Sequence, residues 1–193
     1  MERLRARRAA GDPLLVPLAR LLTDPPGSSR ALELEETTLD LGDQLRQASP
    51  ATGRLKVART NRGVLVTGTI RTSLAESCSR CLRPVALPLE ASLEEEVLPS
   101  VDVASGLPVA AAPEDDEVPR LTDHHELDLE LLLREAIQLA EPIAPLCRPD
   151  CPGLCVVCGG ELASGGHAHA DAPIDPRLEA LRAFRRDEAD ETG

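Results

Sequence analysis

The chain has 193 residues, of which 42% are hydrophobic, and its formal net charge is -12. This length allows one domain, or one domain with a small module, and the core must be aliphatic because Phe184 is the single aromatic residue. No stretch approaches the ~20 apolar residues of a membrane span, and prolines interrupt the N-terminal run LLVPLARLL, unlike a signal peptide. We therefore expect a cytoplasmic protein with no membrane partner.

Charge is distributed unevenly along the chain. Residues 90–135 hold 14 acidic and 2 basic side chains, whereas residues 44–84 hold 8 basic side chains and one acidic one, Glu76. The acidic whole argues against non-specific nucleic-acid binding, but a local basic segment keeps binding to a phosphate backbone possible.

The first third of the chain predicts an arm followed by short elements. Residues 1–13 are expected to form a flexible basic arm. Residues 14–22 predict a strand or a short helix, which Pro25-Pro26-Gly27 ends. Residues 31–41 alternate leucine with polar residues, a pattern typical of a half-buried strand.

A hairpin is predicted next. Residues 54–60 alternate apolar and basic side chains, and Asn61-Arg62-Gly63 supplies turn residues before a second strand begins. That return strand ends at Cys78 and Cys81, so the first thiol pair is expected on a turn.

A further strand and a loop follow this turn. Residues 83–97 alternate apolar and polar side chains, and Pro84 and Pro88 favour a position at the edge of a sheet. Residues 99–123 lack a period and are rich in acidic residues and proline, so they predict an acidic mobile loop.

The strongest helix pattern spans residues 127–140. Asp128 is the expected N-cap, apolar residues recur at helical spacing after it, and Pro142 ends the helix. Residues 175–184 predict a short closing helix that begins at a capping aspartate and a proline.

These elements together predict an α+β fold. It consists of an antiparallel β-sheet with a few helices and a zinc-binding cysteine knuckle within residues 145–170. We expect one domain over residues 14–186 and a disordered tail over residues 187–193.

Six cysteines form two clusters that are far apart in the sequence. The first is a C-x-x-C pair, and the second is a C-x3-C-x3-C-x-x-C run whose last pair is followed by two glycines. Short-spaced thiol pairs separated by a long insertion are typical of a tetrahedral Zn²⁺ site, with Zn–S distances of ~2.3 Å. The predicted metal ligands are Cys78, Cys81, Cys147, Cys151, Cys155 and Cys158.

Six thiols are too many for one four-ligand site and too few for two. One partition places Cys78, Cys81, Cys147 and Cys151 in a first site and completes a second, at Cys155 and Cys158, with His167 or His169. Another joins the two C-x-x-C pairs directly. Spacing alone does not choose between them, and disulfides or a redox C-x-x-C are further alternatives.

No catalytic constellation stands out. The chain has no nucleophile elbow, no phosphate-binding glycine loop and no H-E-x-x-H. A closed four-thiolate site leaves no open position for a reacting water, so we expect a structural metal, no enzyme and no small-molecule substrate.

Several segments resemble the YceD family of large ribosomal RNA subunit accumulation proteins, in the family's order. They are PLLVPLARLLTDPPGSSRALELEE, CSRCLRPV, HELDLELLLREAIQLAEPIAPLCRPDCPGLCVVCGGEL and DPRLEALRAF, so the resemblance covers roughly residues 14–186. The family consists of small bacterial and plastid proteins without an established catalytic activity.

The resemblance implies a ribosome biogenesis factor that supports accumulation or processing of large-subunit (23S) ribosomal RNA. Its implied partners are ribosomal RNA or a large-subunit assembly intermediate. It favours Cys78, Cys81, Cys147 and Cys151 as the core site, with a second site optional. Some members carry a further cysteine pair near the place where this chain has His167 and His169.

Basic side chains of the predicted hairpin and of the first thiol pair offer contacts to RNA phosphates. Because the chain has no aromatic platform for stacking bases, recognition would rest on shape and backbone contacts. The candidate residues are Arg54, Lys56, Arg59, Arg62, Arg80 and Arg83.

Three alternatives to RNA binding stay open. These basic side chains could simply solvate a β surface. The acidic segment 90–135 could instead make the chain a zinc-binding adaptor or chaperone for a basic ribosomal protein. The third alternative is a C-x-x-C thiol-redox protein.

Overall fold

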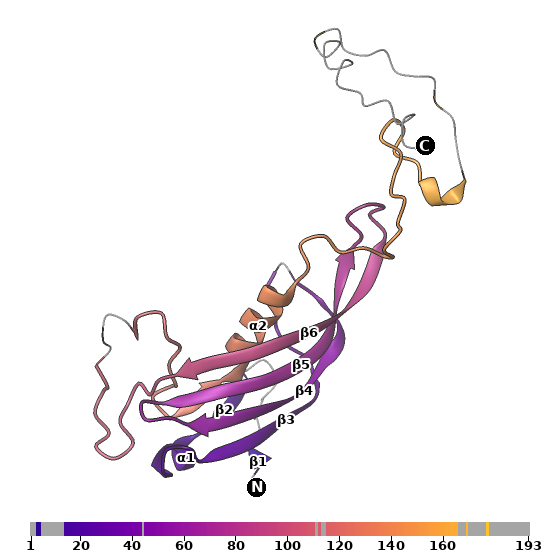
Figure 1. Cartoon of the computed structure of the whole chain (residues 1–193). Helices are drawn as coiled ribbons and strands as arrows, with labels where there is room; N and C mark the ends of the chain where they lie inside the picture. The colour runs from indigo at the N-terminus through magenta and orange to yellow at the C-terminus, as the bar shows by residue number, and fades with distance from the viewer. Residues whose placement is uncertain are drawn as a thin grey trace, which may run out of the picture.

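The computed structural model describes residues 3–4, 14–43, 45–110, 112, 115–165, 169 and 177. One five-stranded sheet has the order β1-β3-β4-β5-β6, and all of its pairs are antiparallel except the short β1–β3 pair (Figure 1). Its strands are β1 (Arg3–Leu4), β3 (Ser29–Thr37), β4 (Gln47–Arg59), β5 (Val64–Ser77) and β6 (Pro84–Val97).

The remaining elements are short, apart from one helix. β2 (Leu15–Pro17) pairs with β7 (Glu126–Asp128), and α1 (Ala19–Thr23) and a single-turn 3-10 helix (Leu162–Ser164) are the short helices described. The long helix is α2 (Leu129–Ala140). Antiparallel strands with helices confirm the predicted α+β class. No helix in the described ranges is long and apolar enough to cross a membrane.

The main core lies between one face of the sheet and α2 (Figure 1). Alternate residues of the strands, such as Leu55 and Ile70, are buried on this face and belong to the same core as Leu132, Leu133 and Ile137 of α2. Aliphatic side chains fill this core, as the composition predicts. No described helix or strand covers the opposite face, which we call the open face of the sheet.

The predicted helix is confirmed together with its cap. The Asp128 carboxylate accepts a hydrogen bond from the Leu131 N–H at 3.2 Å, which satisfies a donor that has no partner within the helix. α2 ends at Ala140, two residues before Pro142. The expected closing helix at 175–184 lies outside the described residues, apart from Arg177.

The hairpin and the strand after it are confirmed, while two other elements differ from expectation. The strand expected over 31–41 ends at Thr37, where its pairing with β4 resumes after a register shift that follows Leu34. Leu39 nevertheless enters the core from irregular backbone. The run 14–22 forms both a strand, β2, and the start of a helix, α1.

The predicted loop at 99–123 is partly held to the sheet. Leu98 forms a parallel bridge with Arg120, and Val101 forms an antiparallel bridge with Pro108. The Ser100 hydroxyl also donates to the Leu121 carbonyl at 2.5 Å. The mobility of this segment stays a prediction.

β5 and β6 extend beyond the rest of the sheet. They pair along their whole length, from Val64–Val97 to Ser77–Pro84, whereas the pairing of β4 with β5 ends at Leu74. The outer end of this hairpin therefore projects from the sheet as a two-stranded arm (Figure 1). The turn at its tip carries the first thiol pair.

Candidate metal centre

Four cysteines from both sequence clusters meet at the tip of the β5–β6 arm. The sulfur of Cys78 lies 3.8 Å from that of Cys151, and the sulfur of Cys81 lies 3.7 Å from that of Cys147. All four sulfurs lie within 4.8 Å of one another. A tetrahedron with metal–sulfur bonds of ~2.3 Å has edges of about 3.8 Å, so this arrangement could hold a metal ion.

The first thiol pair lies on a tight turn closed by backbone hydrogen bonds. The Leu82 N–H donates to the Cys78 carbonyl at 2.8 Å, and the Cys78 N–H donates to the Arg83 carbonyl at 2.9 Å. Leu82 has a φ of 60°, in the left-handed region that favours glycine. The turn itself was predicted from the sequence, but its left-handed residue was not, because Leu82 stands where a glycine would be expected.

The second segment is joined to this turn through its backbone. The Ser79 N–H donates to the Pro145 carbonyl at 2.8 Å, and the Leu154 N–H donates to the Arg80 carbonyl at 3.2 Å. Gly153 has a φ of +81°, and a Cβ there would lie 3.1 Å from the Arg80 carbonyl oxygen. Residues far apart in sequence thus form one compact unit at the arm's tip.

This unit has a core of its own, separate from the core under the sheet. The side chains of Cys78, Cys81 and Cys151 are buried, with Leu146, Cys147 and Leu154 packed partly against them. So few apolar side chains bury too little surface to hold a fold by themselves. A metal ion bound by the four sulfurs would therefore add stability that this small core lacks.

The surroundings of the thiols at the tip shift their pKa values in opposite directions. Backbone N–H groups, that of Cys81 foremost, hydrogen-bond the Cys78 sulfur and lower its pKa to about 6. The backbone N–H of Arg83, followed by its guanidinium, lowers the pKa of Cys81. Burial, ahead of the neighbouring thiols, raises the pKa of Cys147 to about 12. A divalent cation between the sulfurs would supply the positive charge that lets all of them ionise.

Sequence comparisons identify the family. The family described as "Large ribosomal RNA subunit accumulation protein YceD" matches residues 66–185, which include all six cysteines. The chain belongs to the YceD family.

Relatives of this YceD chain occur in bacteria and in a plant. An uncharacterised protein of Mycobacterium tuberculosis is 36% identical over 195 residues, covering 96% of this chain and 87% of the relative. A protein of Zea mays named large ribosomal RNA subunit accumulation protein YCED homolog 1, chloroplastic, is 28% identical over 165 residues, covering 73% and 56%. No solved structure matches the chain.

In this YceD chain the remaining two cysteines lie apart from the four. Cys155 and Cys158 follow on the next turn, where the Cys155 sulfur lies 3.3 Å from Nε2 of His169. The structure thus groups the thiols as four and two, the first of the two partitions left open by the spacing. His167 lies outside the described residues.

The predicted RNA-contacting residues do not share one surface. Arg54 and Lys56 are exposed on the open face of the sheet. The Arg59 guanidinium donates to backbone carbonyls, including that of Leu22, and Arg62 pairs with Glu96 at 2.9 Å.

The last two predicted RNA contacts, Arg80 and Arg83, follow the outer end of β5, which lies about 40 Å from the first residue of that strand, Val64, at ~3.3 Å per residue. Arg80 donates to the Cys151 carbonyl at 2.9 Å, and Arg83 contacts the Cys81 sulfur. These two side chains therefore belong to the surroundings of the candidate metal centre. Sequence reasoning missed this role because it depends on tertiary neighbours.

Proposed function

We propose that this YceD protein is a non-enzymatic factor of large-subunit ribosome assembly that supports accumulation of 23S ribosomal RNA in the cytoplasm. The observation that carries this proposal is the family match, whose description names ribosomal RNA accumulation rather than a catalysed reaction. The name of the Zea mays relative supports the same role.

The proposed metal is one structural Zn²⁺ ion bound by Cys78, Cys81, Cys147 and Cys151. Soft thiolates in a tetrahedral set suit zinc, and four protein ligands leave no position for a reacting water. The ion would fix the arm's tip to the segment that follows α2, in keeping with the small core around the sulfurs. Its role is to hold a shape that the assembly intermediate recognises.

The proposed RNA contact is the open face of the sheet. An open groove of about 1050 Å³ on this face is lined by residues of β3, β4 and β5, among them Arg54, Lys56 and Arg71. Arg54 and Lys56 are two residues apart on one strand, and Arg71 lies on the next strand, opposite Thr52. Thr67 and Thr69 add hydroxyl groups to the same groove.

The carboxylates that pair with two of these cations form only weak ion pairs. Arg54 lies 3.6 Å from Glu33, and Arg71 lies 2.6 Å from Glu90, with both arginine side chains largely exposed. Exposed pairs of this kind contribute about 0–1 kcal/mol, so phosphate groups can replace the carboxylates. Arg30 also lines the groove but pairs with Asp24 at 2.6 Å, so Arg54, Lys56 and Arg71 are the three cations that the groove offers to an RNA backbone.

A genetic complementation experiment tests this function. Cells that lack the gene are expected to show a lower ratio of large-subunit to small-subunit ribosomal RNA, which the wild-type gene restores. A variant with Arg54→Glu, Lys56→Glu and Arg71→Glu should fold but fail to restore the ratio. The matched control reverses three exposed arginines outside the groove, Arg20, Arg46 and Arg148, and should restore it. An unchanged ratio in the deletion strain would contradict the proposed function. Rescue by the variant with the three groove substitutions would show that the groove is not the RNA contact.

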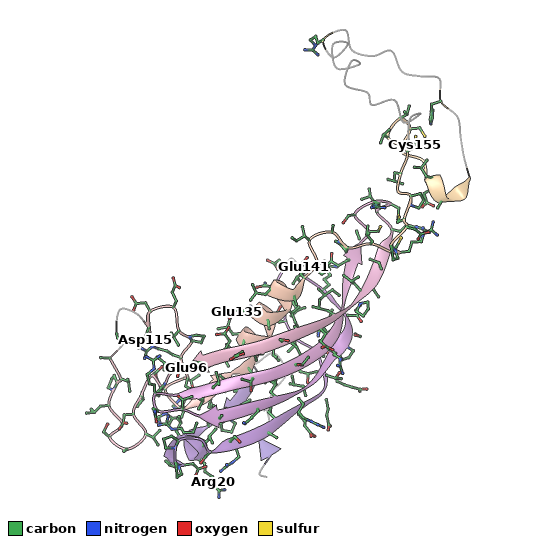
Figure 2. The ribbon with its side chains drawn as sticks, in the orientation of Figure 1. Arg20, Glu96, Asp115, Glu135, Glu141 and Cys155 are labelled. Atoms are coloured by element: carbon green, nitrogen blue, oxygen red, sulfur yellow. The ribbon has the colours of Figure 1, made fainter. Side chains whose placement is uncertain are left out.

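A groove between β6 and α2 favours a second candidate, an adaptor for a basic ribosomal protein. It measures about 370 Å³, and Glu94, Glu95 and Glu135 surround its apolar lining, which includes Leu132 and Leu139. The Leu139 side chain is 86% exposed, and Glu135 lies on α2 (Figure 2). Under this candidate, reversing the three glutamates abolishes complementation, while the sheet-face variant still complements.

A further inference from the structure

β6 is the last strand of the five-stranded sheet, so one of its edges pairs with β5 and the other faces outward (Figure 1). In an antiparallel pair, alternate residues direct both their N–H and their C=O toward the partner strand, and the residues between them direct theirs away. The pairing of β5 with β6 has no register shift from Val64–Val97 to Ser77–Pro84. Every second residue along the whole of β6 therefore has its backbone groups on the outward edge.

The even-numbered residues of β6 are the ones that face outward. Pro84 and Pro88 have no N–H to donate, so they suit outward positions and not positions paired with β5. Just beyond the strand, the Leu98 N–H donates to the Pro119 carbonyl, and the Leu98 carbonyl accepts from the Leu121 N–H, both at 2.9 Å. Both ends of the strand thus give the same parity.

One outward position already holds an added piece of chain. Residues 119–121 run parallel to β6 beside Leu98, where Arg120 forms the bridge. The next outward positions toward the middle of the strand are those around Ser92 and Glu94, whose side chains are exposed. Among the strands that the structure describes, β5 alone pairs with this stretch, and it does so on the opposite edge. The edge here can accept a further strand.

The groove between β6 and α2 runs beside these two positions. It is lined by residues 92–95 of β6 and by Leu132, Ala136 and Leu139 of α2, among others. A strand added to β6 would direct every second side chain to the side of the sheet on which α2 lies. Apolar side chains of such a strand would therefore reach the apolar lining of the groove.

The charges around the groove select the kind of strand that fits. Glu94 and Glu95 of β6 and Glu135 of α2 all line it. A second copy of this chain is a poor occupant, because antiparallel pairing of two β6 edges centred on Ser92 would set Glu94 opposite Glu90, and like charges directly opposite destabilise a sheet. A segment with lysine or arginine at alternate positions would bring opposite charges to the same place.

We propose that the outward edge of β6 at Ser92 and Glu94 binds an extended basic segment of a partner protein as an additional strand of the sheet. The backbone of the segment hydrogen-bonds these two residues, its apolar side chains enter the groove against α2, and its basic side chains lie beside the glutamates. Such binding would be the physical basis of the adaptor candidate, and it rests on that candidate for the partner's identity as a ribosomal protein.

Fluorescence anisotropy with the zinc-loaded full chain and a labelled peptide, Lys-Val-Lys-Leu-Lys-Val-Lys, tests this binding. Micromolar affinity that weakens with added salt is expected. Ser92→Pro removes one outward N–H and places a ring on the edge, so it should weaken binding about tenfold. The matched control is Ala86→Pro, at an exposed outward position of the same strand outside the groove, which should leave the affinity unchanged.

A second pair of variants tests the charges. Reversing the three groove glutamates to lysine should weaken binding of the same peptide about tenfold and flatten its salt dependence. Reversing three exposed acidic residues outside the groove should leave the affinity unchanged. The control residues are Glu35, Asp43 and Glu117.

The backbone contacts can also be tested from the side of the peptide, with the wild-type chain. Two peptides carry methyl groups on alternate backbone nitrogens, one in each parity. The peptide whose methyl groups face β6 should bind about tenfold more weakly than the other. This comparison decides the question even if Ser92→Pro does not fold.

Three outcomes would overturn the proposal. They are equal loss of affinity in folded Ser92→Pro and Ala86→Pro, equal binding of the two methylated peptides, and a dimer of the chain in sedimentation that Ser92→Pro dissociates. None of these experiments measures ribosomal RNA in cells. Failure to bind the peptide, in a chain that restores the ribosomal RNA ratio, would contradict the added strand alone. Peptide binding without any effect of the gene on that ratio would contradict the proposed function alone.

Discussion

At the scale of single residues, Leu82 shows how the first thiol pair is accommodated without a glycine. It takes the left-handed conformation that Gly159 takes on the turn of Cys155 and Cys158, and its side chain is 65% exposed. A residue with a Cβ is disfavoured in this conformation by roughly 1–2 kcal/mol. The turn therefore carries strain that the sulfur contacts at the tip must offset.

Replacing this leucine should relieve the strain. Leu82→Gly is expected to raise the free energy of unfolding by about 1 kcal/mol, because little buried surface is lost and the Cβ conflict disappears. Thermal unfolding of the zinc-loaded protein measures the change, with a shift of a few degrees expected. The matched control is Leu107→Gly, at an equally exposed leucine outside the left-handed region. Equal destabilisation by both substitutions would show that Leu82 is unstrained.

At the scale of elements, α2 and the β5–β6 arm set the position of the candidate metal centre. The helix packs on β6, and the chain that leaves its C-terminus reaches the arm's tip through the Ser79–Pro145 hydrogen bond. The arm brings Cys78 and Cys81 to the same place from the sheet. Fixing the helix on the sheet therefore also fixes the distance between the two thiol segments.

The N-cap of α2 should contribute measurably to stability. Asp128→Ala removes the acceptor for the Leu131 N–H and is expected to cost about 0.5–2 kcal/mol. Urea unfolding of the metal-loaded protein measures it. The control on the same helix is Glu135→Ala, at an exposed position where a change within about 0.5 kcal/mol is expected. If Asp128→Ala lowers the free energy of unfolding no more than the control does, the cap does not stabilise the helix.

At the scale of the whole molecule, the sequence predicted what depends on local pattern. The helix at 129–140 and the hairpin around residues 60–63 follow from periodicity, a capping aspartate and turn residues, which act within a few positions. The early end of β3 and the register shift just before it were not predictable, because both depend on the pairing with a neighbouring strand.

The thiols of the candidate site could be singled out from the sequence, but their grouping could not. Spacing indicates metal-binding thiols, yet which four of them meet depends on where the arm and the segment after α2 lie in space. The same limit applies to the arginines. Arg59 and Arg83 look like free cations in the sequence, but the fold gives them carbonyl and sulfur partners.

Zinc K-edge X-ray absorption on the Cys155→Ser/Cys158→Ser double variant tests the central claim most directly, because only the four-thiol cluster keeps its cysteines. One zinc ion per chain, surrounded by four sulfur atoms at ~2.3 Å, is the predicted result. A variant that folds without zinc and has four titratable thiols, or a zinc ion bound by only two sulfurs, would contradict the four-cysteine centre.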